Sequence, residues 1–122
     1  MVDDDSVIAM MYRLGLERSG YKVVVARDGQ TALELASSAK PDLILLDVRM
    51  PVIDGIEVLR RLAAKGVTER IPVVMLSNYS EATMVAKAMS LGARQYLVKM
   101  ESTPLEVAAI VGRWLVPAMA RV

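Results

Sequence analysis

The 122-residue sequence contains no cysteine, no histidine and no phenylalanine, and it has a single tryptophan. The lack of cysteine excludes a disulfide framework, thiol catalysis and thiolate metal sites. The lack of histidine removes the commonest general base and the commonest metal ligand of proteins. Any chemistry in this chain must therefore use carboxylates, hydroxyls and amines.

An excess of one charge and long apolar runs are also missing. Fifteen basic and fourteen acidic residues give a net charge of +1, without a run of five like charges, which gives no indication of nucleic-acid binding. The apolar runs are far shorter than the roughly 20 residues of a membrane helix. We therefore expect one cytoplasmic domain over residues 1–122 that buries its own core and contacts neither nucleic acid nor membrane directly.

Short apolar segments alternate along the chain with segments of helical length. Val-, Ile- and Leu-rich runs bounded by turn residues predict strands over 21–26, 43–47, 72–76 and 95–98. Apolar spacings of three and four predict helices between them, and a first helix over about 6–18. A last helix should begin at Thr103, where the sequence TPLE offers a capping box.

The alternation predicts an α/β fold, a doubly wound parallel sheet with helices on both faces. The opening strand is short, since only Met1 and Val2 precede an acidic triplet at 3–5. We expect this shortening to leave a gap between the neighbouring strands.

Asp47 stands where hydrophobicity alone would not place a charge. It follows four large aliphatic residues, 43–46, that predict a strand buried on both faces. A carboxylate there must emerge at the end of the sheet or be paired, because an unpaired buried charge is costly. The acids at 3–5, Ser77 and Lys99 also follow predicted strands, so we expect them to meet Asp47 at one edge of the sheet.

Carboxylates that lie within a few ångströms of one another are stable only with a cation between them, and a partly open set of oxygen ligands suits Mg²⁺. An aspartate can attack phosphorus, and a hydroxyl and a lysine can bind phosphoryl oxygens. The residues at this edge therefore predict a phosphoryl-accepting aspartate, Asp47, assisted by Ser77 and Lys99.

Five motifs carry a resemblance to a known family. They are VDDD at 2–5, GYKVVVARDGQTALEL at 20–35, PDLILLDVRMPVIDG at 41–55, IPVVMLS at 71–77 and GARQYLVK at 92–99. With them the chain resembles a response regulator receiver domain, the CheY-like family of two-component signalling. The resemblance implies a five-stranded, flavodoxin-like parallel sheet of order 2-1-3-4-5.

The resemblance also implies a role for each matching residue. Asp47 would be the phosphoacceptor, and Mg²⁺ would be held by Asp3, Asp4, Asp47 and the backbone carbonyl of Arg49. Ser77 would be the switch hydroxyl, Tyr96 the switch aromatic and Lys99 the phosphate-contacting lysine. Pro51 and Gly55 would shape the loop after Asp47.

The implied partners follow from those roles. A histidine kinase or phosphotransfer protein would donate the phosphoryl group. A downstream protein or a second receiver would bind the face of the fourth helix, fifth strand and fifth helix, that is 80–92, 95–98 and the helix from Thr103. The domain would not be an enzyme beyond self-phosphorylation from small donors and autodephosphorylation.

Several alternatives remain open at this point. A pseudo-receiver would keep the fold as a protein interaction module without phosphorylation, and the acids at 3–5 could simply cap the first helix. An aspartyl-nucleophile phosphatase would need a second acid where Arg49 stands, and a nucleotide-binding domain would need a phosphate-cradling loop in place of the acidic triplet.

Met100 stands where the family usually has proline after the lysine. A cis bond before a non-proline residue costs about 3–4 kcal/mol. We therefore expect a trans Lys99–Met100 bond, a rearranged loop up to Pro104 and a less firmly fixed Lys99.

Overall fold

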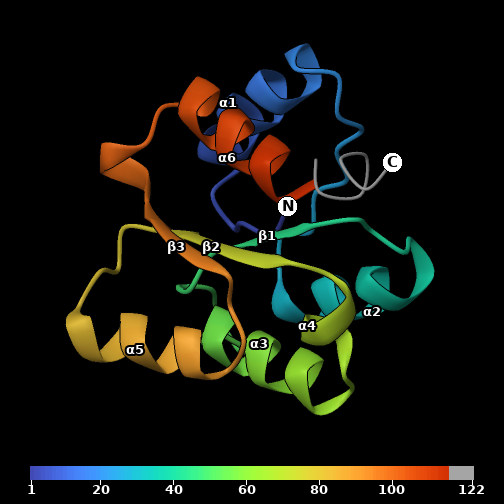
Figure 1. Cartoon of the computed structure of the whole chain (residues 1–122), viewed down its shortest axis with the longest axis vertical. Helices are drawn as coiled ribbons and strands as arrows, with labels where there is room; N and C mark the ends of the chain where they lie inside the picture. The colour runs from blue at the N-terminus through green and yellow to red at the C-terminus, as the bar shows by residue number, and fades with distance from the viewer. Residues whose placement is uncertain (116–122) are drawn as a thin grey trace.

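The computed structural model describes residues 1–115 and has an α/β fold built around a parallel sheet (Figure 1). The strands are β1 Ile44–Leu46, β2 Val73–Ser77 and β3 Gln95–Val98, in the order β1-β2-β3. The helices are α1 Ser6–Arg18, α2 Gly29–Ser38, α3 Gly55–Ala64, α4 Val67–Arg70, α5 Ala82–Ser90 and α6 Pro104–Leu115, with a 3₁₀ turn, η1, over Lys99–Glu101.

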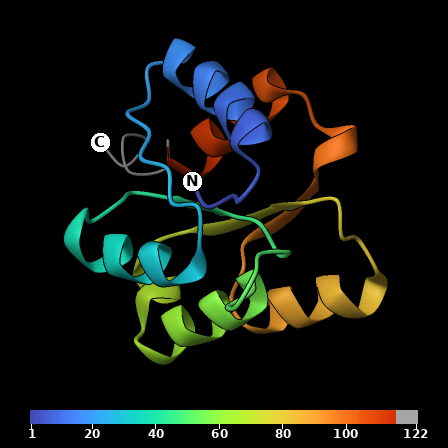
Figure 2. The same cartoon turned by 180° about the vertical axis from the view of Figure 1, so that it is seen from behind.

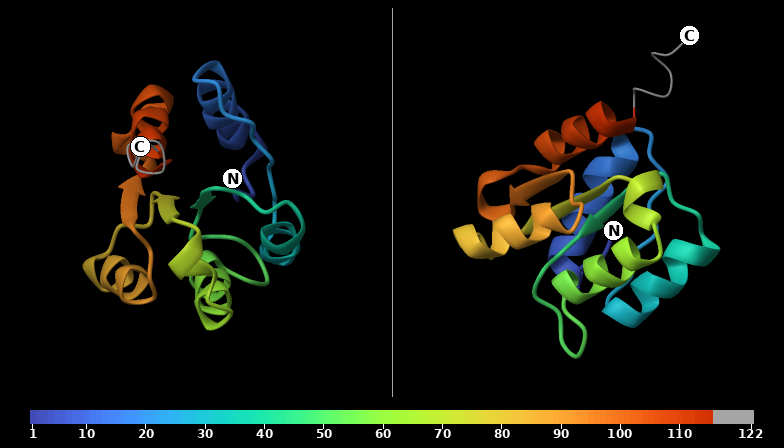
Figure 3. Two further views of the ribbon diagram at one scale, coloured as in Figure 1. Left: turned by 45° about the vertical axis from the view of Figure 1, so that its right-hand side comes forward. Right: turned by 60° about the horizontal axis from the view of Figure 1, so that its bottom comes forward.

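The sheet lies between two layers of helices. Helices α1 and α6 cover one face, and α2, α3 and α5 cover the other, as the view from behind and the turned views show (Figures 2 and 3). Because side chains alternate between the faces of a strand, each strand supplies both cores. Facing α1 and α6 are Leu45, Val74, Leu76 and Leu97; facing the other helices are Ile44, Leu46, Val73 and Met75.

The helix ends are fixed largely by local hydrogen bonds, as expected from the sequence. The Asp5 carboxylate accepts hydrogen bonds from the amides of Val7 and Ile8 and so caps α1. Thr103 and Glu106 form the predicted reciprocal capping box at the start of α6. None of the helices within residues 1–115 combines the length and hydropathy required to cross a bilayer.

The sequence analysis missed α4, a single turn between α3 and β2. It follows Gly66, whose φ of 74° lies in the left-handed region that glycine adopts without strain. Val67 and Thr68 are buried within this turn. The packing of Val67 into the core, which no local pattern reveals, holds the turn in place.

The prediction of a regular strand over 21–26 is wrong. Within the described part of the chain, only Ala26 forms a bridge there, with Val2, and Val2 forms a second bridge with Leu46. A strand is stabilised by hydrogen bonds to a neighbouring strand along its length. Residues 21–26 form such bonds only with Met1–Asp3 among the described residues. The expected order is thus kept, with the first two strands reduced to single bridges.

The N-terminal residues partly fill the gap that we expected between the strands flanking the short first strand. The Val2 amide donates to the Leu45 carbonyl at 2.7 Å, and the Val2 carbonyl accepts from the Asp47 amide at 3.0 Å. On the other side, the Asp3 amide donates to the Ala26 carbonyl at 3.0 Å. Three residues therefore complete the carboxyl end of the sheet and place Asp3 beside Asp47.

The loop between β1 and α3 folds back on the end of the strand. The Gly55 amide donates to the Val48 carbonyl at 2.7 Å, and the Asp54 carboxylate caps α3 through the Glu57 amide. A Cβ atom on Gly55 would lie 1.8 Å from the Asp47 carbonyl oxygen. Only glycine allows this approach, which fixes the backbone of Asp47 from the side of α3.

We expect Gly55→Ala to lower the free energy of unfolding by about 3 kcal/mol, because the clash involves backbone on both sides and cannot be relieved by a side-chain rotation. Urea denaturation measures this. Gly20→Ala is the control: Gly20 has a φ of 93° and open space around it, so it should cost only about 1–2 kcal/mol. Equal losses in the two variants would contradict the close approach.

Candidate functional site

The structure brings four of the predicted site residues to the carboxyl edge of the sheet. Asp47 follows β1, Ser77 is the last residue of β2, Lys99 follows β3, and Asp3 follows the bridging residue Val2. All strands of the sheet are parallel, so their carboxyl ends meet at this edge.

Asp47 is a buried carboxylate with two charge-stabilising partners. It is 6% exposed, its Oδ1 accepts from the Val48 amide at 2.7 Å, and its Oδ2 accepts from the Lys99 ammonium at 2.8 Å. Both hydrogen bonds are made to a carboxylate oxygen, and together they fix the orientation of the side chain. Asp47 is therefore held in one position at the end of β1.

Lys99 lies between two acids. Its ammonium is 2.7 Å from Asp3 Oδ2 and 2.8 Å from Asp47 Oδ2, and all three side chains are at most 8% exposed. Burial raises the pKa of Asp3 above its ordinary value, against the opposing effect of Lys99. Burial acts to lower the pKa of Lys99, but the two carboxylates outweigh it and the pKa is raised.

Asp4 completes an acidic cluster that is open on one side. Asp3, Asp4 and Asp47 each offer a carboxylate oxygen, all within 4.8 Å of one another, and Asp4 is exposed. Asp3 Oδ2 is buried with no hydrogen bond of good geometry among the described residues. Hard oxygen ligands with one open side fit Mg²⁺, which retains several waters when bound.

The three acids at 3–5 therefore have different roles, and the sequence alone did not decide between these roles. Asp5 caps α1, as the alternative reading proposed, whereas Asp3 and Asp4 join Asp47. The Asp3 Oδ1 accepts from the Asp5 amide at 2.9 Å. The start of α1 thus orients the buried carboxylate.

Two residues that the sequence analysis missed hold the backbone around Lys99. The Tyr12 hydroxyl, buried under α6, donates to the carbonyls of Lys99 and Ser102 at 3.2 and 2.7 Å. The Asn78 side-chain oxygen accepts from the Met100 amide at 2.8 Å. An isolated tyrosine in a helix and an asparagine after a strand carry no local signal of these distant contacts.

The peptide bonds of the described chain are all trans, so the Lys99–Met100 bond is trans as expected. The chain turns through η1 in place of the usual proline. Lys99 is nonetheless held in this turn, because Tyr12 and Asn78 bind its backbone surroundings and both carboxylates bind the ammonium. Whether Lys99 is less firmly fixed than before a proline stays a prediction.

Ser77 and Tyr96 meet at the loop that follows β2. The buried Ser77 hydroxyl accepts from the Tyr79 amide at 3.1 Å, and the Tyr96 hydroxyl donates to the Tyr79 carbonyl. Burial raises the pKa of Tyr96, which therefore remains a hydrogen-bond donor at neutral pH. Both side chains thus hold the same loop residue from opposite ends of its backbone.

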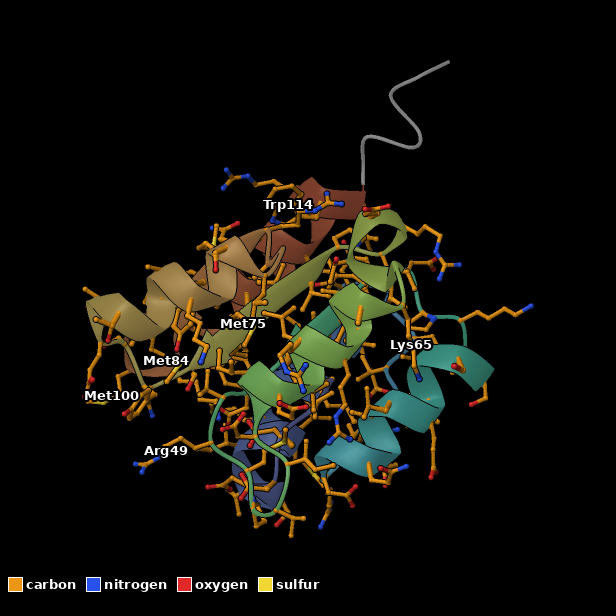
Figure 4. All side chains as sticks on the ribbon, turned by 90° about the horizontal axis from the view of Figure 1, so that it is seen from below. Arg49, Lys65, Met75, Met84, Met100 and Trp114 are labelled. Carbon is orange, nitrogen blue, oxygen red and sulfur yellow. The ribbon has the colours of Figure 1, made fainter. Side chains whose placement is uncertain are left out.

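A cavity of about 470 Å³ opens beside the acidic cluster. It is lined by Asp4, Val48, Arg49, Met50, Pro51, Asp54, Tyr79 and Met84. The exposed Arg49 side chain extends outward at this edge (Figure 4), and its guanidinium stacks over the Tyr79 ring at 5.1 Å. The cavity therefore adjoins the acidic cluster at Asp4.

Comparison with known proteins points to one family. Residues 1–110 match the sequence model of the response regulator receiver domain. The chain is 42% identical over 109 residues to the alkaline phosphatase synthesis transcriptional regulatory protein PhoP of Bacillus subtilis, covering 89% of this chain and 44% of the relative. It is 40% identical over 100 residues to the transcriptional regulatory protein PdtaR of Mycobacterium tuberculosis, covering 81% and 47%. The chain spans about half the length of these curated relatives.

Solved structures show the same fold. The receiver domain of the Francisella response regulator 1452 superposes with a TM-score of 0.87 at 29% identity, covering 96% of this chain and 94% of that one. Chemotaxis protein CheY4 of Vibrio cholerae gives 0.84 at 32% identity, with coverages of 93% and 94%.

We expect Lys99→Met to lower the free energy of unfolding by about 3 kcal/mol at pH 7, because it leaves two buried carboxylates without a counter-charge. The loss should shrink as the pH falls from 7 towards 4. The folded state raises the pKa of Asp3 above 3.8, so it takes up a proton before the unfolded chain does, and protonation relieves the repulsion.

Urea denaturation across this pH range measures the effect. Lys65→Met, which removes an exposed ammonium after α3 (Figure 4), is the control and should change stability by less than about 0.5 kcal/mol. A loss for Lys99→Met that is independent of pH would show that packing, and not charge, accounts for it.

Proposed function

Because the chain belongs to the response regulator receiver family, we propose that it accepts a phosphoryl group on Asp47 from a histidine kinase or phosphotransfer protein. The observation that carries the proposal is the ion-paired, buried Asp47 carboxylate within reach of two further acids. An anion fixed at the end of a strand, beside an open cavity, is positioned to attack an incoming phosphorus atom.

The transfer is a single in-line displacement. An oxygen of the ionised Asp47 forms a bond to phosphorus as the bond from phosphorus to the donor imidazole nitrogen breaks, and the electron pair leaves with the imidazole. The product is an aspartyl phosphate. The Lys99 ammonium, already 2.8 Å from Asp47, offsets negative charge on the phosphoryl oxygens without first being brought into place.

Mg²⁺ is the cofactor that this site would hold, through Asp3, Asp4, Asp47 and the Arg49 backbone carbonyl. When bound, it supplies further positive charge at the phosphoryl oxygens. Asp3 pairs with Lys99 in the structure, so the ammonium and the metal would compete for the Asp3 carboxylate.

Ser77 and Tyr96 would convert phosphorylation into a change of shape. The Ser77 hydroxyl now accepts from the Tyr79 amide, and its own proton could be donated to a phosphoryl oxygen, which would reorient it. The Tyr96 hydroxyl bonds to the same residue, Tyr79. The change would shift the equilibrium between two packings of the face formed by α5, β3 and α6. This face is the proposed binding surface for a downstream protein or a second receiver. The size of this shift equals the difference between the free energies with which the phosphoryl group interacts in the two packings.

The donor would approach at the edge where Asp47 lies. Three apolar side chains next in sequence to the site segments are exposed there: Val7 after the acidic triplet, Val52 in the loop after Asp47, and Met100 after Lys99. Exposed apolar side chains around a recessed acceptor favour docking of a protein donor.

The second candidate function is a pseudo-receiver that binds partners without phosphorylation. The Arg49–Tyr79 stack favours it, because these two side chains occupy the wall of the cavity that adjoins the acidic cluster at Asp4. The two functions differ in whether Asp47 can be labelled.

Incubation with acetyl phosphate and Mg²⁺ should add one phosphoryl group to the protein, seen by intact-mass spectrometry. Asp47→Asn should abolish labelling, because an amide is not a nucleophile of comparable strength. The control Asp42→Asn, an exposed acid just before β1, should label as the original chain does. An original chain that stays unlabelled would favour the pseudo-receiver instead.

We expect Asp4→Ala to weaken Mg²⁺ binding at least about tenfold, since a divalent ion held by three acids loses one of them. Asp42→Ala should bind as before. The affinity should also fall as the pH is lowered from 7 towards 4, because Asp3, with its raised pKa, must release its proton to bind the ion. Titration followed by NMR measures all three, and an unchanged affinity in Asp4→Ala would refute the site.

A further inference from the structure

The peptide unit between Lys99 and Met100 is held at both ends by side chains from distant parts of the chain. Its carbonyl accepts from the Tyr12 hydroxyl of α1 at 3.2 Å, and its N–H donates to the side-chain oxygen of Asn78 at 2.8 Å. The C=O and N–H of a trans peptide point in opposite directions, so the two partners hold this unit from opposite sides. The backbone next to Lys99 therefore has a fixed orientation.

The contact made by Asn78 extends the ladder between β2 and β3. Ser77 and Val98 are the last residues paired in that ladder. Beyond them, the side-chain carbonyl of Asn78 accepts the hydrogen bond of the Met100 amide. One side chain thus ties the loop after β2 to the turn after β3.

This tie lies between the two groups proposed to bind the phosphoryl oxygens. Asn78 directly follows Ser77, and Met100 directly follows Lys99. The Lys99 ammonium now contacts two carboxylates, and it would have to turn from them to the phosphoryl oxygens during transfer. Because the stem of lysine is flexible, the ammonium then depends on the backbone turn for its position.

The tie requires a residue other than proline at position 100. Proline, which the family usually has there, carries no N–H and could not donate to Asn78. The acceptor at 78 and the donor at 100 therefore form a pair in which each is useful only with the other. Asn78 is exposed, so its removal leaves no buried gap and should have little effect on the stability of the fold.

We propose that Asn78 is a positioning residue for phosphoryl transfer to Asp47, acting through the Met100 amide on the turn that carries Lys99. This inference rests on the proposed function and adds to it a residue that acts through Lys99. Its signature is that Asn78 affects the reaction only while residue 100 has an N–H to donate.

The rate of labelling by acetyl phosphate with Mg²⁺, followed by intact-mass spectrometry, tests this signature in a double-mutant cycle. Asn78→Ala should slow labelling about fivefold in the original chain, as expected for the loss of one hydrogen bond that aligns a reacting group. The slowing should be the same in Met100→Leu, which keeps the amide. In Met100→Pro, which lacks it, Asn78→Ala should change the rate less than about twofold.

A second measurement needs no phosphorylation. The Lys99 side chain is 8% exposed and paired, so its ammonium should give a ¹⁵N–¹H signal that exchanges slowly with water. Asn78→Ala should speed this exchange severalfold, because a looser turn opens more often, whereas Met100→Leu should not. Urea denaturation should give nearly the same midpoint for Asn78→Ala and the original chain.

Three results would overturn the proposal: no slowing of labelling by Asn78→Ala, equal slowing in the Met100→Leu and Met100→Pro backgrounds, or unchanged exchange of the ammonium in Asn78→Ala. If Met100→Pro does not fold, the exchange of the ammonium decides. An original chain that takes no label would refute the proposed function alone. In that case faster exchange in Asn78→Ala still supports the positioning of Lys99 by Asn78, and unchanged exchange still overturns it.

Discussion

The Lys99 ammonium, buried between Asp3 and Asp47, is the interaction on which the rest of this edge depends. It joins three segments that are far apart in the sequence: the N-terminal residues, the end of β1 and the turn after β3. Without it, two carboxylates would repel each other at the centre of the sheet edge. Tyr12 from α1 and Asn78 from the loop after β2 fix the backbone on either side of this lysine.

The arrangement has a thermodynamic cost. Taking three ions out of water costs several kcal/mol each, and their mutual attraction recovers this only when the geometry is good. The cost is lowered here by neutral groups that the main chain supplies, namely the Val48 and Asp5 amides, which bind the two carboxylates. A purely apolar edge of the same volume would be cheaper to fold but would present no carboxylates.

Features that depend on local chemistry were predictable from the sequence. The bounds of α1, the capping box at Thr103 and the strand-end position of Asp47 were all read from residues a few positions apart. Features that depend on distant partners were not. Residues 21–26 have strand-like composition but lack a full-length neighbour, and the link from Tyr12 to Lys99 spans 87 positions.

The same limit explains the acidic triplet. Composition could not show which of Asp3, Asp4 and Asp5 caps α1 and which belong to the acidic cluster. Their roles depend on where Val2 enters the sheet. Once Val2 pairs with Leu46, alternation buries Asp3 and leaves Asp5 at the first turn of α1. Each role follows from the register of one residue.

The way Asp3 enters the sheet also separates the acidic cluster from the strands that carry it. Asp3 is placed beside Asp47 by the hydrogen bonds of Val2 and of its own amide, and Val2 pairs through isolated bridges to Ala26 and Leu46. The strands β1, β2 and β3 pair with one another through a ladder of their own. Opening the two bridges would therefore take Asp3 away from Asp47 and Lys99 without unpairing a single residue of that ladder.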